Sequence, residues 1–417
     1  MLGLVLEGGG ARGAYEIGAV RAYIENGYKF DGVVGTSIGS INGAAIAQGD
    51  FDTALELWEN MTMEKLFPDD ADFLKLISDK EFDADDIPSA ARKLRLLIKN
   101  KGIDTKYIKE LLREHIDEDK LRESDTEFGL VTYSVSDRKK LSLFKNDIPK
   151  GELENYLLAS SMLPVFKNEK IDGKYFADGG YVDICPYNML IEKGYDELVV
   201  VRVFGMGLTR RMKSKDTKIQ MVIPSDKLPG MLDFSKEAVH SAMEMGYYDA
   251  LRIIKGYKGR KYYIEPQNEN FYFGKLCSLK QKYLRAIANI LDLPSLPGKR
   301  LLFDGIIPCL AASIELPENF TYEEFVIALL ESAALSKNIG RFKVMTFDEF
   351  LSVVSDGIYT NPKKKYTEIT FPYRNPTESA DVFRLPPAPL PTSYSYKLPT
   401  EKKLGNAIEV FIRAILE

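Results

Sequence analysis

The sequence contains very little histidine and very little cysteine for its length. Only two histidines, His115 and His240, occur in 417 residues, and both lie in stretches with a helical pattern. Most serine hydrolases use a histidine as general base, so this scarcity disfavours a Ser-His-Asp triad. The three cysteines, Cys185, Cys277 and Cys309, show neither the spacing of a metal site nor the even number of a disulfide framework. We therefore expect a reducing compartment.

Long apolar segments and a strong charge of one sign are also missing. No run approaches the roughly 18 apolar residues that a membrane-spanning helix needs. No basic segment followed by an apolar stretch and a cleavage site marks a secretory signal. The net charge of −5 gives no general attraction to nucleic acid or to anionic membranes. We expect a cytoplasmic protein that binds no nucleic acid and touches membranes only locally and peripherally, with secretion through another signal left open.

The features that carry chemistry begin in the first forty residues. The apolar run Met1 to Leu6 predicts a buried strand, and a helix-like segment starts soon after it. Between them lie four glycines, Gly8, Gly9, Gly10 and Gly13. Bare backbone N–H groups between a strand and a helix start form an anion site that the helix dipole strengthens. Beside an activated serine, that anion would be the oxyanion of a tetrahedral intermediate.

A second motif is Gly35-Thr36-Ser37-Ile38-Gly39, which follows the apolar pair Val33-Val34 and precedes the helix-like run Ile41 to Gln48. Strand, sharp turn and helix is the setting in which Gly-x-Ser-x-Gly presents a nucleophilic serine. Such a turn holds Ser37 in a strained conformation, and bulkier residues in place of Gly35 and Gly39 would collide. The pentapeptide alone also fits an ordinary glycine-rich turn.

An alternative interpretation concerns the same glycines. Gly8, Gly10 and Gly13 also spell G-x-G-x-x-G after a strand, the fingerprint of a dinucleotide-binding oxidoreductase. That class expects an acidic residue at the end of the second strand, where it holds a ribose. Asp31 lies near the required distance but precedes the second strand, which ends instead in the Ser37 turn. A Walker-type phosphate loop is excluded because no Gly-Lys-Ser or Gly-Lys-Thr follows.

Together these motifs resemble those of the patatin-like phospholipase family. The glycine run and the Gly-x-Ser-x-Gly turn are joined by Asp178-Gly179-Gly180, which fits the family's aspartate turn. A lesser family feature, an Ala-Ser run shortly before a proline, matches Ala159 to Pro164. Three motifs in this order are a far stronger signal than any one of them. The resemblance covers residues 1–258, and nothing beyond residue 260 is recognised.

The resemblance implies a serine acyl-ester hydrolase that acts on phospholipids, lysophospholipids or related acyl lipids, and that needs no metal or other cofactor. It implies a Ser-Asp dyad in which Ser37 attacks the ester carbonyl and Asp178 accepts the proton. The oxyanion hole would be formed by residues of the glycine loop: Gly8, Gly9, Gly10, Arg12 and Gly13. Arg12 is expected to brace this loop through backbone carbonyls. A catalytically silent lipid-binding protein is a further alternative, which the presence of both dyad residues disfavours.

The order of the elements predicts an α/β fold with two parts. In residues 1–258, strand-like and helix-like runs alternate, which predicts a mostly parallel central sheet covered by helices on both faces. Glu197 to Phe204 is the most continuously apolar strand. Residues 62–104 are expected to form an insertion near the mouth of the site, or a solvated helical pair. Residues 259–417 are expected to form a mainly helical, proline-rich appendage of unassigned function, with helices over 276–291, 322–335 and 347–354.

Two surface features complete the expectations. A basic loop carries Arg210, Arg211, Lys213, Lys215 and Lys218. Most such runs are solvated surface, and contact with lipid headgroups is the alternative. Residues 362–400 are rich in proline and tyrosine, which predicts an extended segment lying on the surface or a stiff spacer. The last helix, Thr400 to Leu416, has an apolar face that we expect to dock on the domain rather than on a membrane. The residues of this face are Leu404, Ile408, Phe411, Ile412 and Ile415.

Overall fold

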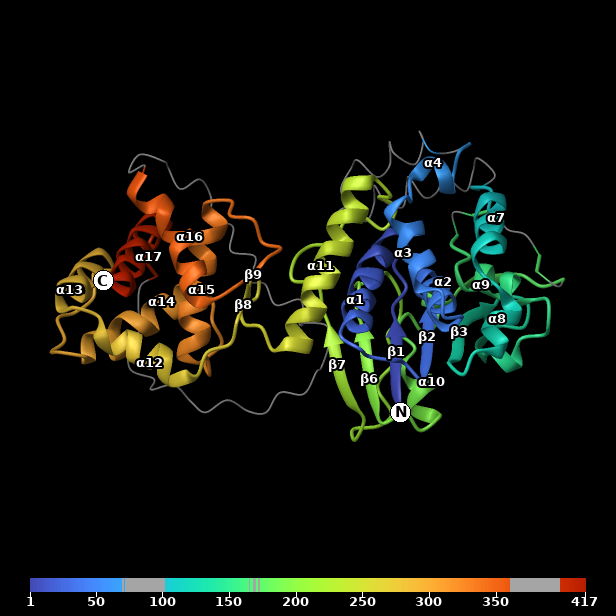
Figure 1. Cartoon of the computed structure of the whole chain (residues 1–417), viewed down its shortest axis with the longest axis horizontal. Coiled ribbons are helices and arrows are strands. Elements are labelled where there is room, and N and C mark those ends of the chain that lie inside the picture. Colours follow the sequence, from blue (N-terminus) through green and yellow to red (C-terminus); the bar gives the residue numbers. More distant parts are fainter. Residues whose placement is uncertain (70, 72–101, 165, 168–169, 172, 361–397) are drawn as a thin grey trace. The chain divides into compact units, whose positions relative to one another are not determined.

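The computed structural model describes residues 1–69, 71, 102–164, 166–167, 170–171, 173–360 and 398–417. The chain forms two compact units, Met1–Lys255 and Gly256–Glu417 (Figure 1). The boundary predicted from the sequence lies between residues 258 and 259. Most of the expected insertion at 62–104 and of the proline-rich segment at 362–400 lies outside the described residues. No helix in the described ranges has the length and apolar composition needed to cross a membrane.

The first unit is built on a seven-stranded sheet. Its strands are β1 (Leu2–Leu6), β2 (Gly32–Thr36), β3 (Glu127–Ser134), β4 (Lys139–Phe144), β5 (Phe176–Asp178), β6 (Glu197–Val201) and β7 (Lys218–Val222). The order is β4-β3-β2-β1-β6-β7, with β5 also paired to β3. β4 and β5 are antiparallel to β3, and the other pairs are parallel. Because β1 and β2 are parallel neighbours, the segments after Leu6 and Thr36 meet at one edge.

Helices cover both faces of this sheet. α1 (Gly13–Glu25), α2 (Ile38–Ala47) and α11 (Lys236–Lys255) lie on one face (Figure 1). On the other face, α10 (Tyr187–Glu192) packs against alternate strand residues such as Val5, Val34 and Val200. Burial on two sides explains why these strands are apolar without alternation, and the predicted fold class is confirmed. The remaining helices of this unit are α3 (Phe51–Glu59), α4 (Met63–Leu66), α7 (Lys106–His115), α8 (Glu118–Glu123) and α9 (Leu153–Ser160).

The structure corrects three predicted boundaries. The strand predicted over 197–204 ends at Val201, because the backbone N–H groups of Val203 and Phe204 turn toward the Glu7 carboxylate, at 2.7 and 2.8 Å. Lys218 begins β7 and so does not lie in a loop. The helix predicted over 276–291 is two helices, α12 (Glu269–Ser278) and α13 (Gln281–Ile290), separated by non-helical backbone with ψ of 127° and 140°.

The second unit is mainly helical, as predicted. Besides α12 and α13 it contains α14 (Ile307–Ser313), α15 (Tyr322–Ser336), α16 (Phe347–Thr360) and α17 (Glu401–Leu416), with a short parallel pair, β8 (Tyr263–Ile264) and β9 (Val344–Met345). The segment Leu301–Ile306, just before α14, is a π-helix. Neither that segment nor α14 was predicted.

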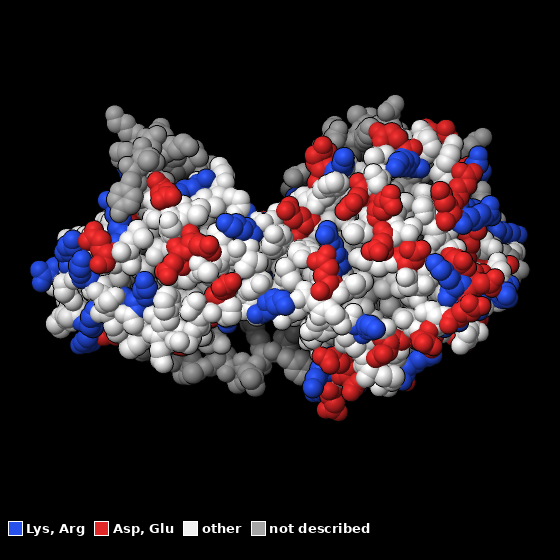
Figure 2. Space-filling model, in the orientation of Figure 1, with Lys and Arg blue, Asp and Glu red and all other residues white. Residues whose placement is uncertain are grey.

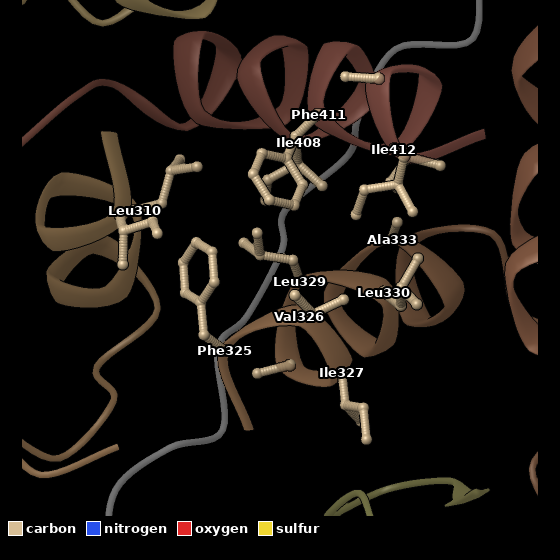
Figure 3. Packing of buried hydrophobic residues seen from close by; sticks show 14 of the residues in the cluster. Leu310, Phe325, Val326, Ile327, Leu329, Leu330, Ala333, Ile408, Phe411 and Ile412 are labelled. Carbon is tan, nitrogen blue, oxygen red and sulfur yellow. The ribbon is translucent and has the colours of Figure 1, made fainter. Parts of the chain in front are cut away.

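The core of the second unit lies between α15 and the C-terminal helix α17. Figure 3 shows Ile408, Phe411 and Ile412 of α17 directed toward Phe325 and Leu329 of α15. The rings of Phe411 and Phe325 meet edge to face, with centroids 5.6 Å apart, a favoured geometry for buried aromatic pairs. All five apolar positions predicted for this helix are buried, so the docked interpretation is confirmed.

Candidate active site

Ser37 occupies the turn between β2 and α2. Its backbone has φ 55° and ψ −128°, a left-handed conformation that costs on the order of 1–3 kcal/mol in a residue other than glycine. The Ser37 N–H donates to Ser160 Oγ at 2.9 Å, and Ser160 Oγ donates in turn to the Val131 carbonyl at 2.7 Å. The predicted strand, turn and helix around Ser37 are therefore present, and the turn is held from a distant segment.

Glycine at position 35 is required by a close approach of the chain to itself. A Cβ on Gly35 would lie 2.1 Å from the carbonyl oxygen of Gly39, at the start of α2. Neither Gly35 nor the Gly39 carbonyl can shift to relieve this clash without moving the Ser37 turn between them. The close packing of the end of β2 against the start of α2 therefore explains why the motif has glycine at position 35.

The glycine loop after β1 lies directly against this turn. A Cβ on Gly8 would be 3.2 Å from Ser37 Cβ. The Gly8 N–H donates to the Ile184 carbonyl at 3.0 Å, and the N–H groups of Arg12 and Gly13 donate within the loop. In the described part of the chain, the N–H groups of Gly9 and Gly10 have no acceptor. The five residues predicted for the oxyanion hole thus divide into two with a free donor and three whose donors are used.

Arg12 supports the loop rather than offering it a further donor. Its guanidinium donates to the carbonyl of Pro229 at 2.9 Å, of Val203 at 3.2 Å and of Phe204 at 2.8 Å. These carbonyls lie after β6 and before α11. Arg12 therefore ties the glycine loop to two distant segments.

Asp178 ends β5 and opens the short 3-10 turn Gly179–Tyr181. Its Oδ1 accepts the Gly180 N–H at 2.7 Å, and its Oδ2 is buried and makes no hydrogen bond of normal geometry with any residue that the structure describes. Burial raises the pKa of Asp178 to about 6, although the neighbouring Ser37 hydroxyl and the Gly180 N–H lower it. A carboxylate with an open oxygen beside a serine and a pKa near neutrality is suited to accept a proton.

Two further residues hold the site, and no role was predicted for either of them from the sequence. Glu7 is fully buried at the end of β1. Its carboxylate accepts the N–H groups of Val203 and Phe204 and pairs with Arg202 at 2.8 Å. Glu7 could have been predicted from the sequence, because it is a charged residue between a buried strand and a glycine run. Ser160, which holds the Ser37 N–H, lies in the Ala-Ser run that was noted only as a family feature.

The two histidines lie elsewhere. His240 on α11 contacts the Glu59 carbonyl at 3.1 Å, and His115 at the end of α7 lies beside Glu114. In the described ranges neither ring is hydrogen-bonded to Ser37 or Asp178.

The dinucleotide interpretation loses its support in the structure. The Asp31 carboxylate accepts the Leu2 N–H at 2.7 Å, at the amino end of β1. The glycine loop follows the carboxyl end of the same strand, and strands rise by about 3.3 Å per residue. Asp31 therefore lies at the opposite edge of the sheet from the loop that would hold the pyrophosphate.

Comparison with known proteins assigns the part of the chain that contains this site to a family. Residues 4–191 match the family model described as patatin-like phospholipase. This part of the chain, which contains Ser37 and Asp178, belongs to the patatin-like phospholipase family.

Two curated relatives share a short and well-matched stretch with the chain. A patatin-like phospholipase domain-containing protein of Caenorhabditis elegans is 51% identical over 55 residues, which are 13% of this chain and 4% of that protein. A lysophospholipase of Aspergillus terreus is 51% identical over 47 residues, 11% of this chain and 3% of that enzyme. The chain thus spans only a small part of the length of these relatives.

Two solved structures also match the chain along most of its length. VipD from Legionella pneumophila is 15% identical with a TM-score of 0.40, covering 87% of this chain and 81% of that one. ExoU from Pseudomonas aeruginosa, in complex with SpcU, is 16% identical with a TM-score of 0.29, covering 88% and 72%. At these scores the likeness carries no argument about function.

Proposed function

We propose that this protein is a serine hydrolase that cleaves fatty-acyl esters of phospholipids or lysophospholipids. One observation carries the proposal: a strained serine turn, a buried carboxylate with an open oxygen and two free backbone donors converge at one edge of the sheet. Membership of residues 4–191 in the patatin-like phospholipase family supports lipid esters as the substrate class.

In the proposed mechanism, Ser37 Oγ attacks the ester carbonyl carbon while Asp178 Oδ2 takes the hydroxyl proton. The tetrahedral intermediate collapses, the alcohol leaves, and Asp178 returns the proton to its oxygen. A water molecule then attacks the acyl-serine ester, again losing a proton to Asp178, and the fatty acid is released with Ser37 restored. A single carboxylate therefore serves as base and acid in both halves of the reaction.

The N–H groups of Gly9 and Gly10 are proposed to stabilise the oxyanion. A carboxylate is a weak base toward a serine hydroxyl, so the stabilisation of developing negative charge must contribute heavily. Ser37 and Asp178 are only 8% and 7% exposed. Hydrogen bonds to an oxyanion are stronger where water is excluded, which favours a buried site of this kind.

A fluorophosphonate probe tests the proposed class directly. The probe phosphonylates an activated serine and leaves ordinary serines unmodified. We expect the purified protein to be labelled with a stoichiometry near one, with the modified residue identified as Ser37 by peptide mass spectrometry. A dinucleotide-binding oxidoreductase or a catalytically silent lipid-binding protein would not react, so absence of labelling would reject the proposal.

The glycine loop offers a second test with an internal rescue. A Cβ on Gly9 would lie 2.5 Å from Cγ2 of the buried Val203 side chain, so we expect Gly9→Ala to displace the loop and its two free N–H groups. We expect kcat to fall by about 10²-fold, as when an oxyanion donor is lost, with a smaller change in KM. The double variant Gly9→Ala, Val203→Ala removes the clash and should regain most of the loss.

Val203→Ala alone is the matched control, because it leaves the loop backbone free to keep its position. Steady-state kinetics on a chromogenic ester distinguish the outcomes. A rise in KM with kcat unchanged would mean that the loop binds ground-state substrate and is not an oxyanion hole.

A further inference from the structure

The segment Phe204-Gly205-Met206-Gly207-Leu208 crosses both catalytic loops. A Cβ on Gly205 would lie 1.8 Å from the Gly8 carbonyl oxygen, and a Cβ on Gly207 would lie 2.5 Å from the Gly180 carbonyl oxygen. The Leu208 N–H also donates to the Gly180 carbonyl at 2.9 Å. The two glycines let the segment press against the glycine loop and the aspartate turn at once.

The other face of this segment presents large apolar side chains to solvent. Phe204 is 39% exposed, Met206 82% and Leu208 59%, and Tyr181 from the aspartate turn is 68% exposed. Single exposed apolar residues are common on protein surfaces. Four of them around the loops that carry the proposed catalytic groups form the kind of cluster that marks an interaction site.

The backbone at Phe204 has a strained conformation that hydrogen bonds from neighbouring segments fix in place. Its φ is +49°, an outlier for a bulky residue. The N–H donates to the buried Glu7 carboxylate at 2.8 Å, and the carbonyl accepts from Arg12 at 2.8 Å. Two charged groups therefore maintain a conformation in which an aromatic side chain stays partly in water. A loop held in this way loses little conformational entropy when it binds.

A basic stretch follows the apolar cluster immediately. Between Thr209 and Lys218 there are five basic side chains and one acidic one, Asp216. Lys213 pairs with Glu192, and Arg210 Nε donates to the Val182 carbonyl at 2.8 Å. Arg210 and Arg211 are both exposed and follow Leu208 closely in the chain. Over the face of the molecule in Figure 2, acidic and basic side chains are intermixed. Apolar side chains flanked by basic ones match the boundary between acyl chains and anionic headgroups.

From these observations we propose that residues 204–215 form a docking loop that seats the active site on an anionic phospholipid bilayer. Phe204, Met206 and Leu208 enter the acyl region, and the basic residues contact the headgroups. The proposal rests on the proposed lipid hydrolysis, because docking would place an acyl ester beside the Gly8 and Gly180 backbones. It names a surface and a partner, which the hydrolytic mechanism itself does not require.

Binding is tested on the full-length Ser37→Ala chain, so that no hydrolysis alters the vesicles. The probes are vesicles of phosphatidylcholine and of an equal mixture of phosphatidylcholine and phosphatidylglycerol, with binding measured by flotation. We expect this chain to bind the mixed vesicles more tightly. Adding Met206→Ser and Leu208→Ser should weaken that binding by about tenfold or more, because the apolar insertion is lost. Adding Arg211→Gln and Lys215→Gln should weaken it by about fivefold per charge, and only for the mixed vesicles.

Two control variants match these changes in type but lie elsewhere in the first unit. Ile24→Ser with Val135→Ser removes two exposed apolar side chains, and Lys29→Gln with Lys139→Gln removes two exposed charges. Both should leave vesicle binding unchanged. Equal weakening by a control and by the matching loop variant would overturn the proposal, since the effect would then not belong to residues 204–215.

Two other outcomes would also reject docking on lipid. One is vesicle binding that the Met206 and Leu208 changes do not affect. The other is absence of vesicle binding together with concentration-dependent self-association that those changes abolish, which would assign the surface to a second copy of the chain. Hydrolysis of a water-soluble p-nitrophenyl ester by the chain with Ser37 present reports on the proposed function separately. Its failure is therefore distinguishable from a failure of docking.

Discussion

Replacement of Ser37 by alanine is expected to abolish ester hydrolysis and fluorophosphonate labelling while the fold stays intact. The change removes one oxygen, and the Ser37 hydroxyl makes no hydrogen bond of normal geometry among the described residues that the fold would lose. The backbone bond from the Ser37 N–H to Ser160 is retained. Loss of a serine nucleophile lowers kcat by up to about 10⁶-fold in hydrolases of known mechanism. Hydrolysis of a chromogenic ester, with circular dichroism as the check on folding, measures the effect.

Ser161→Ala is the matched control for this prediction. Ser161 follows Ser160, whose hydroxyl accepts the Ser37 N–H. The Ser161 hydroxyl is buried and has no hydrogen-bond partner among the described residues, so its removal should leave both activity and folding near those of the unchanged chain. A Ser37→Ala protein that cleaves p-nitrophenyl esters at the original rate would show that another residue is the nucleophile.

The second large effect is expected at Asp178. Asp178→Asn should lose nearly all activity, since an amide cannot accept the serine proton. The double variant His115→Gln, His240→Gln should keep most of its kcat, because in the described structure neither ring is hydrogen-bonded to Ser37 or Asp178. A triad enzyme would behave in the opposite way, with a histidine replacement almost as damaging as loss of the nucleophile. Inactivity of a folded double-histidine variant would exclude the Ser-Asp dyad.

The pH dependence follows from the ionisation of the same carboxyl group. The base must be ionised, so kcat/KM should rise as the pH passes through about 6, the value to which burial raises the pKa of Asp178. A histidine would titrate near 6.5, so the position of the rising limb alone does not distinguish the two groups. Its persistence in the double-histidine variant does.

The same raised pKa predicts an effect on stability with a definite sign. Because the folded-state pKa of about 6 is above the ordinary value of 3.8, the neutral carboxyl is favoured in the fold. That stability is present below pH 3.8 and is lost as the pH rises through 6. At neutral pH the ionised carboxylate destabilises the fold, by about 3 kcal/mol at most. Asp178→Asn should therefore raise the melting temperature at pH 7 and change it little at pH 4, by differential scanning calorimetry.

The sequence by itself determined the elements that local patterns encode. Apolar runs without alternation predicted the buried strands, because a parallel sheet covered on both faces leaves no polar side. The apolar face of the last helix was readable because helical periodicity brings Ile408 and Ile412 to one side. Ser37 was readable because strand, glycine turn and helix are contiguous in the chain.

Tertiary structure decided everything that depends on partners distant in sequence. The two donors left free, at Gly9 and Gly10, are known only once the Gly8 N–H is seen to bind the Ile184 carbonyl. The raised pKa of Asp178 follows from burial, and burial cannot be predicted from the Asp-Gly-Gly motif. The alternation from Phe204 to Leu208 is visible in the sequence, yet only packing on Gly8 and Gly180 decides that the glycines face inward. Local pattern specifies which element forms, whereas the free groups, the buried charges and the exposed faces are set by long-range contacts.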